Sequence, residues 1–284
     1  MSGRARVVAR FGAELILRTE SGELLRAVSR RNLVKHGPDG DNAVAVALEP
    51  RRNILVRPDH RGRPHAGAAN IDQVLIVIAP LPTPDWGIID RYLTAVAALT
   101  ATPLLIVNKS DLLDSSDARL IADTEALYGG LGYPVLRTSV KNGDGIETLR
   151  ERLRGHTSLL VGQSGVGKSS LTRALDPGLE VRIGELSALS GEGRHTTTVA
   201  HLYALSSGGD LIDSPGVRDF APYQPTAEDL AAGFPEIAEC AHDCRFHDCR
   251  HRAEPGCAVK AAAEAGRIPS SRLRSFLELK GNST

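Results

Sequence analysis

The sequence predicts a chain of three parts: a small OB-like β-barrel over residues 1–66, an α/β domain over 67–233, and a mostly helical domain over 234–284. Three observations lead to this division. Short apolar segments of period two fill the first part, buried strands alternate with helical segments in the second, and Cys and His crowd into residues 240–257 of the third. A length of 284 residues with 42% hydrophobic residues fits a folded protein of two or three domains.

The first part contains about five short strands within residues 4–57, separated by turn-forming glycines and prolines. So many short strands in so short a segment predict a small barrel, OB-like or SH3-like. Residues 57–67 (RPDHRGRPHAG) are polar, with two prolines and two glycines, and we expect them to form a linker.

Charge is divided unevenly along the chain. Residues 1–67 carry a net charge of +6 and residues 68–233 a net charge of −7, although the whole chain is neutral. A basic first domain suggests contact with a polyanion, and an ordinary solvated surface is the alternative. Phe11 is the only aromatic residue in 1–67, so we expect contact with folded RNA through phosphates and shape rather than through base stacking.

The central part alternates strand and helix, which predicts a parallel sheet covered by helices on both faces. The expected strands are 73–79, 103–107, 134–136 and 158–161, and the expected helices are 90–99, 112–128 and 145–154. No stretch of eighteen or more apolar residues occurs, and the first residues lack an apolar signal core. We therefore expect no membrane contact and a cytoplasmic location.

A phosphate loop follows the last of these strands. Gly162 is followed by four residues and then by Gly167, Lys168 and Ser169. Glycines let backbone N–H groups surround phosphates, Lys168 reaches the outer phosphates, and the Ser169 hydroxyl binds Mg²⁺. The helix that follows adds its positive N-terminal end.

A motif that reads guanine follows the strand at 103–107. Asp111 of Asn108-Lys109-Ser110-Asp111 can accept hydrogen bonds from N1–H and the exocyclic amine of guanine, a donor pair that adenine lacks. Asn108 is expected to brace the neighbouring loops and Lys109 to lie along the base. A helix N-cap at Asp111 is the alternative. A further loop, Thr138-Ser139-Val140-Lys141, offers backbone groups to the guanine oxygen.

Two further segments are expected at the outermost phosphate. Asp213 in Asp213-Ser214-Pro215-Gly216 is expected to hold Mg²⁺ through a bridging water, and the Gly216 N–H is expected to contact the phosphate. A simple turn is the alternative. One of Thr196, Thr197 and Thr198 is expected to complete the Mg²⁺ shell. The predicted GTP site therefore consists of Asn108, Lys109, Ser110, Asp111, Ser139, Val140, Lys141, Gly162, Gln163, Ser164, Gly165, Val166, Gly167, Lys168, Ser169, Ser170, Thr196, Thr197, Thr198, Asp213 and Gly216.

A possible metal site lies near the C-terminus, where Cys244, Cys249, His251 and Cys257 offer three thiolates and an imidazole. Four such ligands suit tetrahedral zinc, which would stabilise a short segment with little apolar content. A disulfide is the alternative, and Cys240, His242 and His247 are rival ligands.

The base-reading loops precede the phosphate loop, an order opposite to that of ordinary translational GTPases. A circular permutation preserves the same site in space. With NKSD, TSVK, GQSGVGKSS, GRHTTT and DSPG in this order, together with CRFHDCRHRAEPGCAV at 244–259, the chain resembles the bacterial circularly permuted GTPases that depend on the small ribosomal subunit. The resemblance implies an N-terminal OB barrel, a P-loop GTPase domain, and one structural zinc on residues 244, 249, 251 and 257. It also implies action in late maturation of the small subunit, with its rRNA and GTP/GDP as partners, and we expect a monomer.

Hydrolysis is expected to be slow without a partner. Val217 stands where many GTPases place a glutamine that orients the attacking water, and it can make no hydrogen bond through its side chain. His195 is the best replacement in the sequence, with Lys168 as the second catalytic residue; an ordinary loop histidine is the alternative. Two other functions remain open: an ATP-using P-loop enzyme, and a nucleotide-sensing, RNA-binding assembly factor with incidental hydrolysis.

Overall fold

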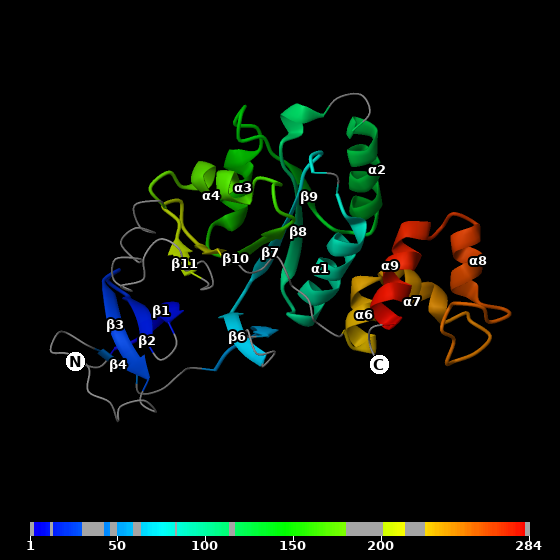
Figure 1. Cartoon of the computed structure of the whole chain (residues 1–284), viewed down its shortest axis with the longest axis horizontal. Coiled ribbons are helices and arrows are strands. Elements are labelled where there is room, and N and C mark those ends of the chain that lie inside the picture. Colours follow the sequence, from blue (N-terminus) through cyan, green and yellow to red (C-terminus); the bar gives the residue numbers. More distant parts are fainter. Residues whose placement is uncertain are drawn as a thin grey trace.

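The computed structural model describes residues 3–11, 14–29, 43–45, 50–58, 64–82, 84–113, 117–179, 201–213 and 225–281. These residues form three sheets and a set of helices (Figure 1). The predicted multidomain α/β architecture is confirmed. The exact domain boundaries stay predictions.

The first part of the chain forms a four-stranded sheet in the order β1-β2-β3-β4. Its strands are β1 (Ala5–Phe11), β2 (Glu14–Thr19), β3 (Leu24–Ser29) and β4 (Ala43–Ala45). The first three strands are antiparallel neighbours, and β4 pairs with β3 in parallel. The chain that joins β3 to β4 lies outside the described residues, and so do the residues that follow β4.

The expected linker at 57–67 is wrong for all of its described residues, 57–58 and 64–67. β5 (Ile54–Pro58) and β6 (Pro64–Ala69) form an antiparallel hairpin in which Pro58 pairs with Pro64. Prolines and glycines indicated a linker, but a two-stranded sheet has edges on both sides and therefore tolerates prolines that donate no hydrogen bond. The predicted boundary after residue 66 falls inside β6.

The central sheet has six strands in the order β11-β12-β10-β7-β8-β9. All neighbours are parallel except β11 (His201–Ala204), which pairs with β12 (Asp210–Asp213) in an antiparallel hairpin at the sheet edge. The other strands are β7 (Gln73–Ile78), β8 (Thr102–Val107), β9 (Val135–Arg137) and β10 (Thr157–Gly162).

Alternate residues of the central strands pack against helices on opposite faces of the sheet. Val74 and Ile76 share one core with α1 (Trp86–Ala98) and α2 (Asp117–Gly130). Leu75 and Val77 share the other with α3 (Ile146–Leu153) and α4 (Lys168–Leu175). Both faces are covered, as the continuous apolar strands predicted.

Two of the predicted helices have different boundaries. α1 begins four residues earlier than expected, because the Asp85 carboxylate caps it by accepting from the Ile88 N–H. The expected helix over 112–128 is wrong at its start, where a 3₁₀ turn, η2 (Ser110–Leu112), precedes α2. Lys109 has φ 57°, and this left-handed residue prevents the strand from continuing directly into an α-helix.

The C-terminal part contains α6 (Ala227–Gly233), α7 (Pro235–Ala241), α8 (Ala258–Glu264) and α9 (Ser270–Gly281) around a core of their own. Figure 1 shows α6 and α9 against α1 at one end of the molecule and the N-terminal sheet beside β11 at the other. Within the described part of the chain, no helix combines the length and apolar character needed to cross a membrane.

Candidate nucleotide site and metal centre

The predicted nucleotide-binding segments meet at one edge of the central sheet. The phosphate loop follows β10, the Asn108–Asp111 segment follows β8, and the Ser139 loop follows β9. Because these strands are parallel and in register, their carboxyl ends lie together, which is where open α/β sheets bind ligands.

The phosphate loop has the backbone that its glycines predict. Gly162 and Gly167 have φ of 145° and 96°, and a Cβ on Gly167 would lie 2.3 Å from Asn108 Nδ2. Val166 is fully buried and anchors the loop, whereas Ser164, Gly165, Ser169 and Ser170 are exposed. Lys168 begins α4 and its Nζ donates to Gly162 O and Gln163 O, each at 2.7 Å, so its ammonium lies within the loop.

Asn108 and Lys109 join the base loop to the phosphate loop. Asn108 Nδ2 donates to Val166 O at 2.9 Å, and Asn108 Oδ1 accepts from the Thr138 hydroxyl at 3.1 Å. Lys109 Nζ donates to Gly165 O at 2.7 Å and to Leu81 O at 2.9 Å. Asn108 therefore braces three loops, as the sequence led us to expect, and Lys109 extends toward the phosphate loop.

The Asp111 carboxylate is held in a fixed orientation. Ser139 Oγ donates to Asp111 Oδ1 at 2.6 Å, and Lys141 Nζ lies 3.8 Å from Asp111 Oδ2. The Ser139 hydrogen bond and the Lys141 charge hold the pKa of Asp111 below its usual range despite some desolvation, so the group is ionised at neutral pH. Asp111 lies inside η2, whose N-cap is Lys109, so it is not the helix N-cap of the alternative interpretation.

Several predicted site residues lie outside the described part of the chain. These are His195, Thr196, Thr197, Thr198 and Gly216, together with Val217. The backbone of Asp213 ends β12 and pairs with His201, which places the start of the DSPG segment at the end of a strand next to β10.

Cys244, Cys249, His251 and Cys257 lie together, with ligand atoms all within 4.8 Å of one another. His251 Nδ1 is 3.6 Å from Cys244 Sγ and 3.5 Å from Cys257 Sγ, and the two sulfurs are 4.0 Å apart. Ligands of a tetrahedral zinc are about 3.5–3.8 Å apart, so the spacing of Cys244, His251 and Cys257 is close to that of such a site, and Cys249 lies near enough to be the fourth ligand. Among the described residues Cys240, His242 and His247 are not part of this group.

The surroundings of the cluster favour metal ligation. Burial opposes the thiolate of Cys244, but hydrogen bonds from the Val259 and Ala258 backbone lower its pKa overall. Burial raises the pKa of Cys249 to about 11, a cost that a bound cation would offset. Burial and the charge of Lys280 lower the pKa of His251, which keeps the imidazole neutral as a ligand must be.

Metal removal is expected to unfold the segment around residues 244–257. The purified chain should contain one equivalent of zinc, and a Cys249→Ser variant should lose most of it, since three ligands hold zinc far more weakly than four. Metal content by mass spectrometry and circular dichroism with and without chelator test this. Cys240→Ser is the matched control, because that thiol lies outside the cluster; zinc loss in the control but not in Cys249→Ser would contradict the ligand set.

A buried ion-pair network that the sequence reasoning missed joins the C-terminal helices to the central domain. Arg272 of α9 is fully buried and donates to Asp90 Oδ1 of α1 at 2.6 Å and to Glu236 Oε1 of α7 at 2.7 Å. The Tyr128 hydroxyl also donates to Asp90 Oδ1, at 2.7 Å. The sequence does contain a sign of this burial: Arg272 lies four residues from both Ile268 and Phe276, at a position where the helical pattern predicts an apolar, buried side chain.

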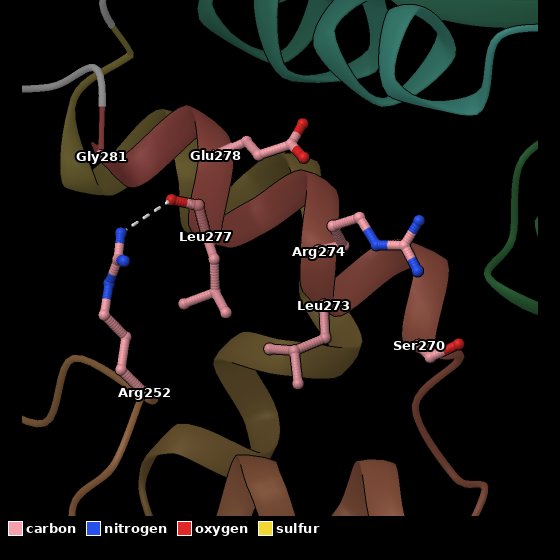
Figure 2. A pocket seen from close by; sticks show the side chains of 7 residues that line it. All are labelled: Arg252, Ser270, Leu273, Arg274, Leu277, Glu278 and Gly281. Atoms are coloured by element: carbon pink, nitrogen blue, oxygen red, sulfur yellow. Dashed lines mark hydrogen bonds between the residues drawn. The ribbon is translucent and has the colours of Figure 1, made fainter.

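Figure 2 shows the outer side of the same helix. Arg252, from the loop between two metal ligands, donates to Leu277 O at 3.5 Å across a shallow groove on α9. Arg274 extends away from the helix. The loop that carries the Cys/His cluster is thus attached to α9, which Arg272 attaches to the central domain.

The phosphate loop, the Asn108–Asp111 segment and the sheet order define a P-loop GTPase whose motifs run in circularly permuted order. A family model described as RsgA GTPase matches residues 48–222, and the chain belongs to that family. It is 45% identical over 283 residues to the small ribosomal subunit biogenesis GTPase RsgA of Ectopseudomonas mendocina, covering 95% of this chain and 82% of that protein.

Solved structures agree with this assignment. The crystal structure of YjeQ from Thermotoga maritima matches with a TM-score of 0.76 and 31% identity, over 98% of this chain and 97% of the other. The structure of YloQ, described as a circularly permuted GTPase, matches with a TM-score of 0.71 and 26% identity, over 98% and 94%.

Proposed function

We propose that this chain hydrolyses GTP during the maturation of the small ribosomal subunit, in the cytoplasm and as a monomer. The observation that carries the choice of GTP is the Asp111 carboxylate, ionised and held by Ser139 next to a phosphate loop that Asn108 braces. The small subunit as partner is supported by the names of the relatives, and rRNA contact by the +6 charge of residues 1–67.

The site residues have distinct roles in this proposal. Lys168 and the phosphate-loop N–H groups bind the phosphates. Ser169 and Asp213 would hold Mg²⁺, which would supply charge neutralisation at the transferred phosphate. One of Thr196, Thr197 and Thr198 completes the Mg²⁺ shell, and Gly216 contacts the outermost phosphate. Zinc on residues 244, 249, 251 and 257 is structural, because four protein ligands leave no open position.

Subunit binding is proposed to supply what the isolated chain lacks. Val217 cannot orient the attacking water, so intrinsic turnover is slow and His195 acts on that water once the subunit has bound. GTP turnover should rise strongly on adding small ribosomal subunits. His195→Ala should lower the stimulated rate by about 10²-fold, the usual contribution of a positioned acid or base, and leave GTP affinity unchanged.

Phosphate-release assays with and without small subunits measure both rates, and fluorescent GTP binding provides the control. Unchanged stimulation in His195→Ala would exclude His195 from catalysis. Intact GTP binding without any stimulation of the parent chain would instead support a nucleotide-sensing assembly factor, and preference for ATP would contradict the role of Asp111.

A further inference from the structure

The N-terminal sheet contacts the central domain at the β11–β12 hairpin. Val8, Ala9 and Ile16 of the N-terminal sheet share a buried cluster with Tyr203 of β11 and Leu179. β11 lies at the edge of the central sheet, where β12 is its neighbour among the described strands, and β1 packs beside it (Figure 1).

Two arginines of the N-terminal sheet converge on one carboxylate at the start of β12. Asp210 accepts hydrogen bonds from Arg6 of β1 and from Arg18 of β2, the second at 2.5 Å. The Asp210 side chain is only 12% exposed, whereas that of Arg6 is 45% exposed. Arg6 also donates to the hydroxyl of Thr157 at 3.3 Å, and Thr157 pairs with Asp210 at the start of β10 and β12. We call Arg6, Arg18 and Asp210 the arginine clasp.

The hairpin leads from the clasp to the nucleotide site. Asp210 pairs with Ala204 at one end of the hairpin, and Asp213 pairs with His201 at the other, where the DSPG segment begins. His201 stands three positions after Thr198, the last of the candidate magnesium threonines. The turn of the hairpin is also tied to the phosphate-loop helix, because Asp176 after α4 accepts from the Ser206 N–H at 2.7 Å.

We infer that Asp210 is a positioning residue: through the arginine clasp, RNA bound to the N-terminal sheet shifts the β11–β12 hairpin and so sets the rate of GTP hydrolysis. The inference rests on the proposed function, since the small subunit supplies the RNA. The exposed part of Arg6 is accessible to an RNA phosphate. Because Asp210 binds the same guanidinium, the phosphate and the carboxylate compete for one cation. Among the described strands, β11 lies at the sheet edge and contacts β1, so a movement of the N-terminal sheet acts on β11 first.

The first test is Asp210→Asn in the full chain, which keeps the shape of the side chain and removes its charge. The subunit-stimulated turnover at saturating subunit should fall about three- to tenfold, as expected for a coupling residue. Intrinsic turnover should change less than about twofold, since Asp210 lies outside the predicted nucleotide site. Subunit affinity should not fall, because the Arg6 guanidinium is then free of the competing carboxylate. Equal loss of intrinsic and stimulated turnover, or unchanged stimulation, would overturn the inference.

A double-mutant cycle separates the clasp from general charge effects. If Arg18 acts through Asp210, a double variant with Arg18→Gln and Asp210→Asn should lower the subunit stimulation no more than either single variant does. Arg51→Gln is the matched control, because Arg51 is an exposed arginine of the first part outside the clasp. It should leave the saturated rate unchanged. Additive effects in the cycle, or an equal loss in the control, would overturn the clasp.

A readout without ribosomes distinguishes failure of this inference from failure of the proposed function. Amide hydrogen exchange in 201–213 of the parent chain should respond to heparin, a polyanion, while β7 and β8 stay unchanged. The response should disappear in Asp210→Asn, and an equal response in both chains would overturn the inference. A parent chain that small subunits do not stimulate, but whose hairpin responds to heparin through Asp210, would contradict the proposed function alone.

Discussion

Asp111→Asn should convert the chain from a guanine-binding to a xanthine-binding protein. An asparagine amide places an N–H donor toward the exocyclic amine of guanine, whereas xanthine has a carbonyl oxygen at that position. We expect GTP affinity to fall by about 10²-fold or more, because two N–H donors that face each other in a binding site cannot form a hydrogen bond. XTP should bind more tightly than GTP to the variant.

The variant should fold normally, since the Ser139 hydroxyl can donate to the amide oxygen of residue 111 as it does to the carboxylate. Competition between GTP, XTP and ATP for a fluorescent nucleotide measures the change. Asp123→Asn is the matched control: it removes the same charge from an exposed position of α2 and should leave nucleotide preference unchanged. If Asp111→Asn still preferred GTP, Asp111 would not be the residue that reads guanine.

Arg272→Met should destabilise the C-terminal helices by about 3–5 kcal/mol, because removal of one partner leaves buried charges without compensation. Asp90 is fully buried, and its pKa is raised by burial although the Arg272 charge acts in the opposite direction. Glu236 would lose both of its hydrogen bonds from Arg272, at 2.7 and 3.0 Å. The guanidinium also lies 4.2 Å from the centre of the Phe234 ring, a cation–π contact that Met cannot make.

Unfolding in guanidinium chloride, followed by circular dichroism, measures the loss in free energy of unfolding. Arg274→Met on the same helix is the control, since Arg274 is exposed, and it should change stability by less than about 0.5 kcal/mol. Asp90→Asn combined with Arg272→Met should restore part of the loss, because the unpaired charge is removed. Equal stability of Arg272→Met and the control would show that the network contributes nothing net.

The nucleotide motifs could be predicted from the sequence because each is local. The four residues between Gly162 and Gly167, and the two between Asn108 and Asp111, fix which side chains share a loop. The same holds for the metal ligands, which lie within fourteen residues, although His251 adopts φ 60°, a left-handed conformation that no pattern indicated. The linker prediction at 57–67 failed because proline marks strand ends as well as linkers: Pro58 ends β5 and Pro64 begins β6.

The sequence by itself therefore determined the candidate chemistry of the chain: a phosphate loop, a carboxylate predicted to read guanine and a cluster of potential metal ligands, each defined by spacing along a short segment. Only the tertiary structure decided what joins the domains. Arg272 meets Asp90 across 182 positions of sequence, and Arg18 meets Asp210 across 192. The residues next to an arginine in the sequence are the same whether its side chain faces water or a distant carboxylate. Its ion-pair partner is therefore set only by the tertiary structure.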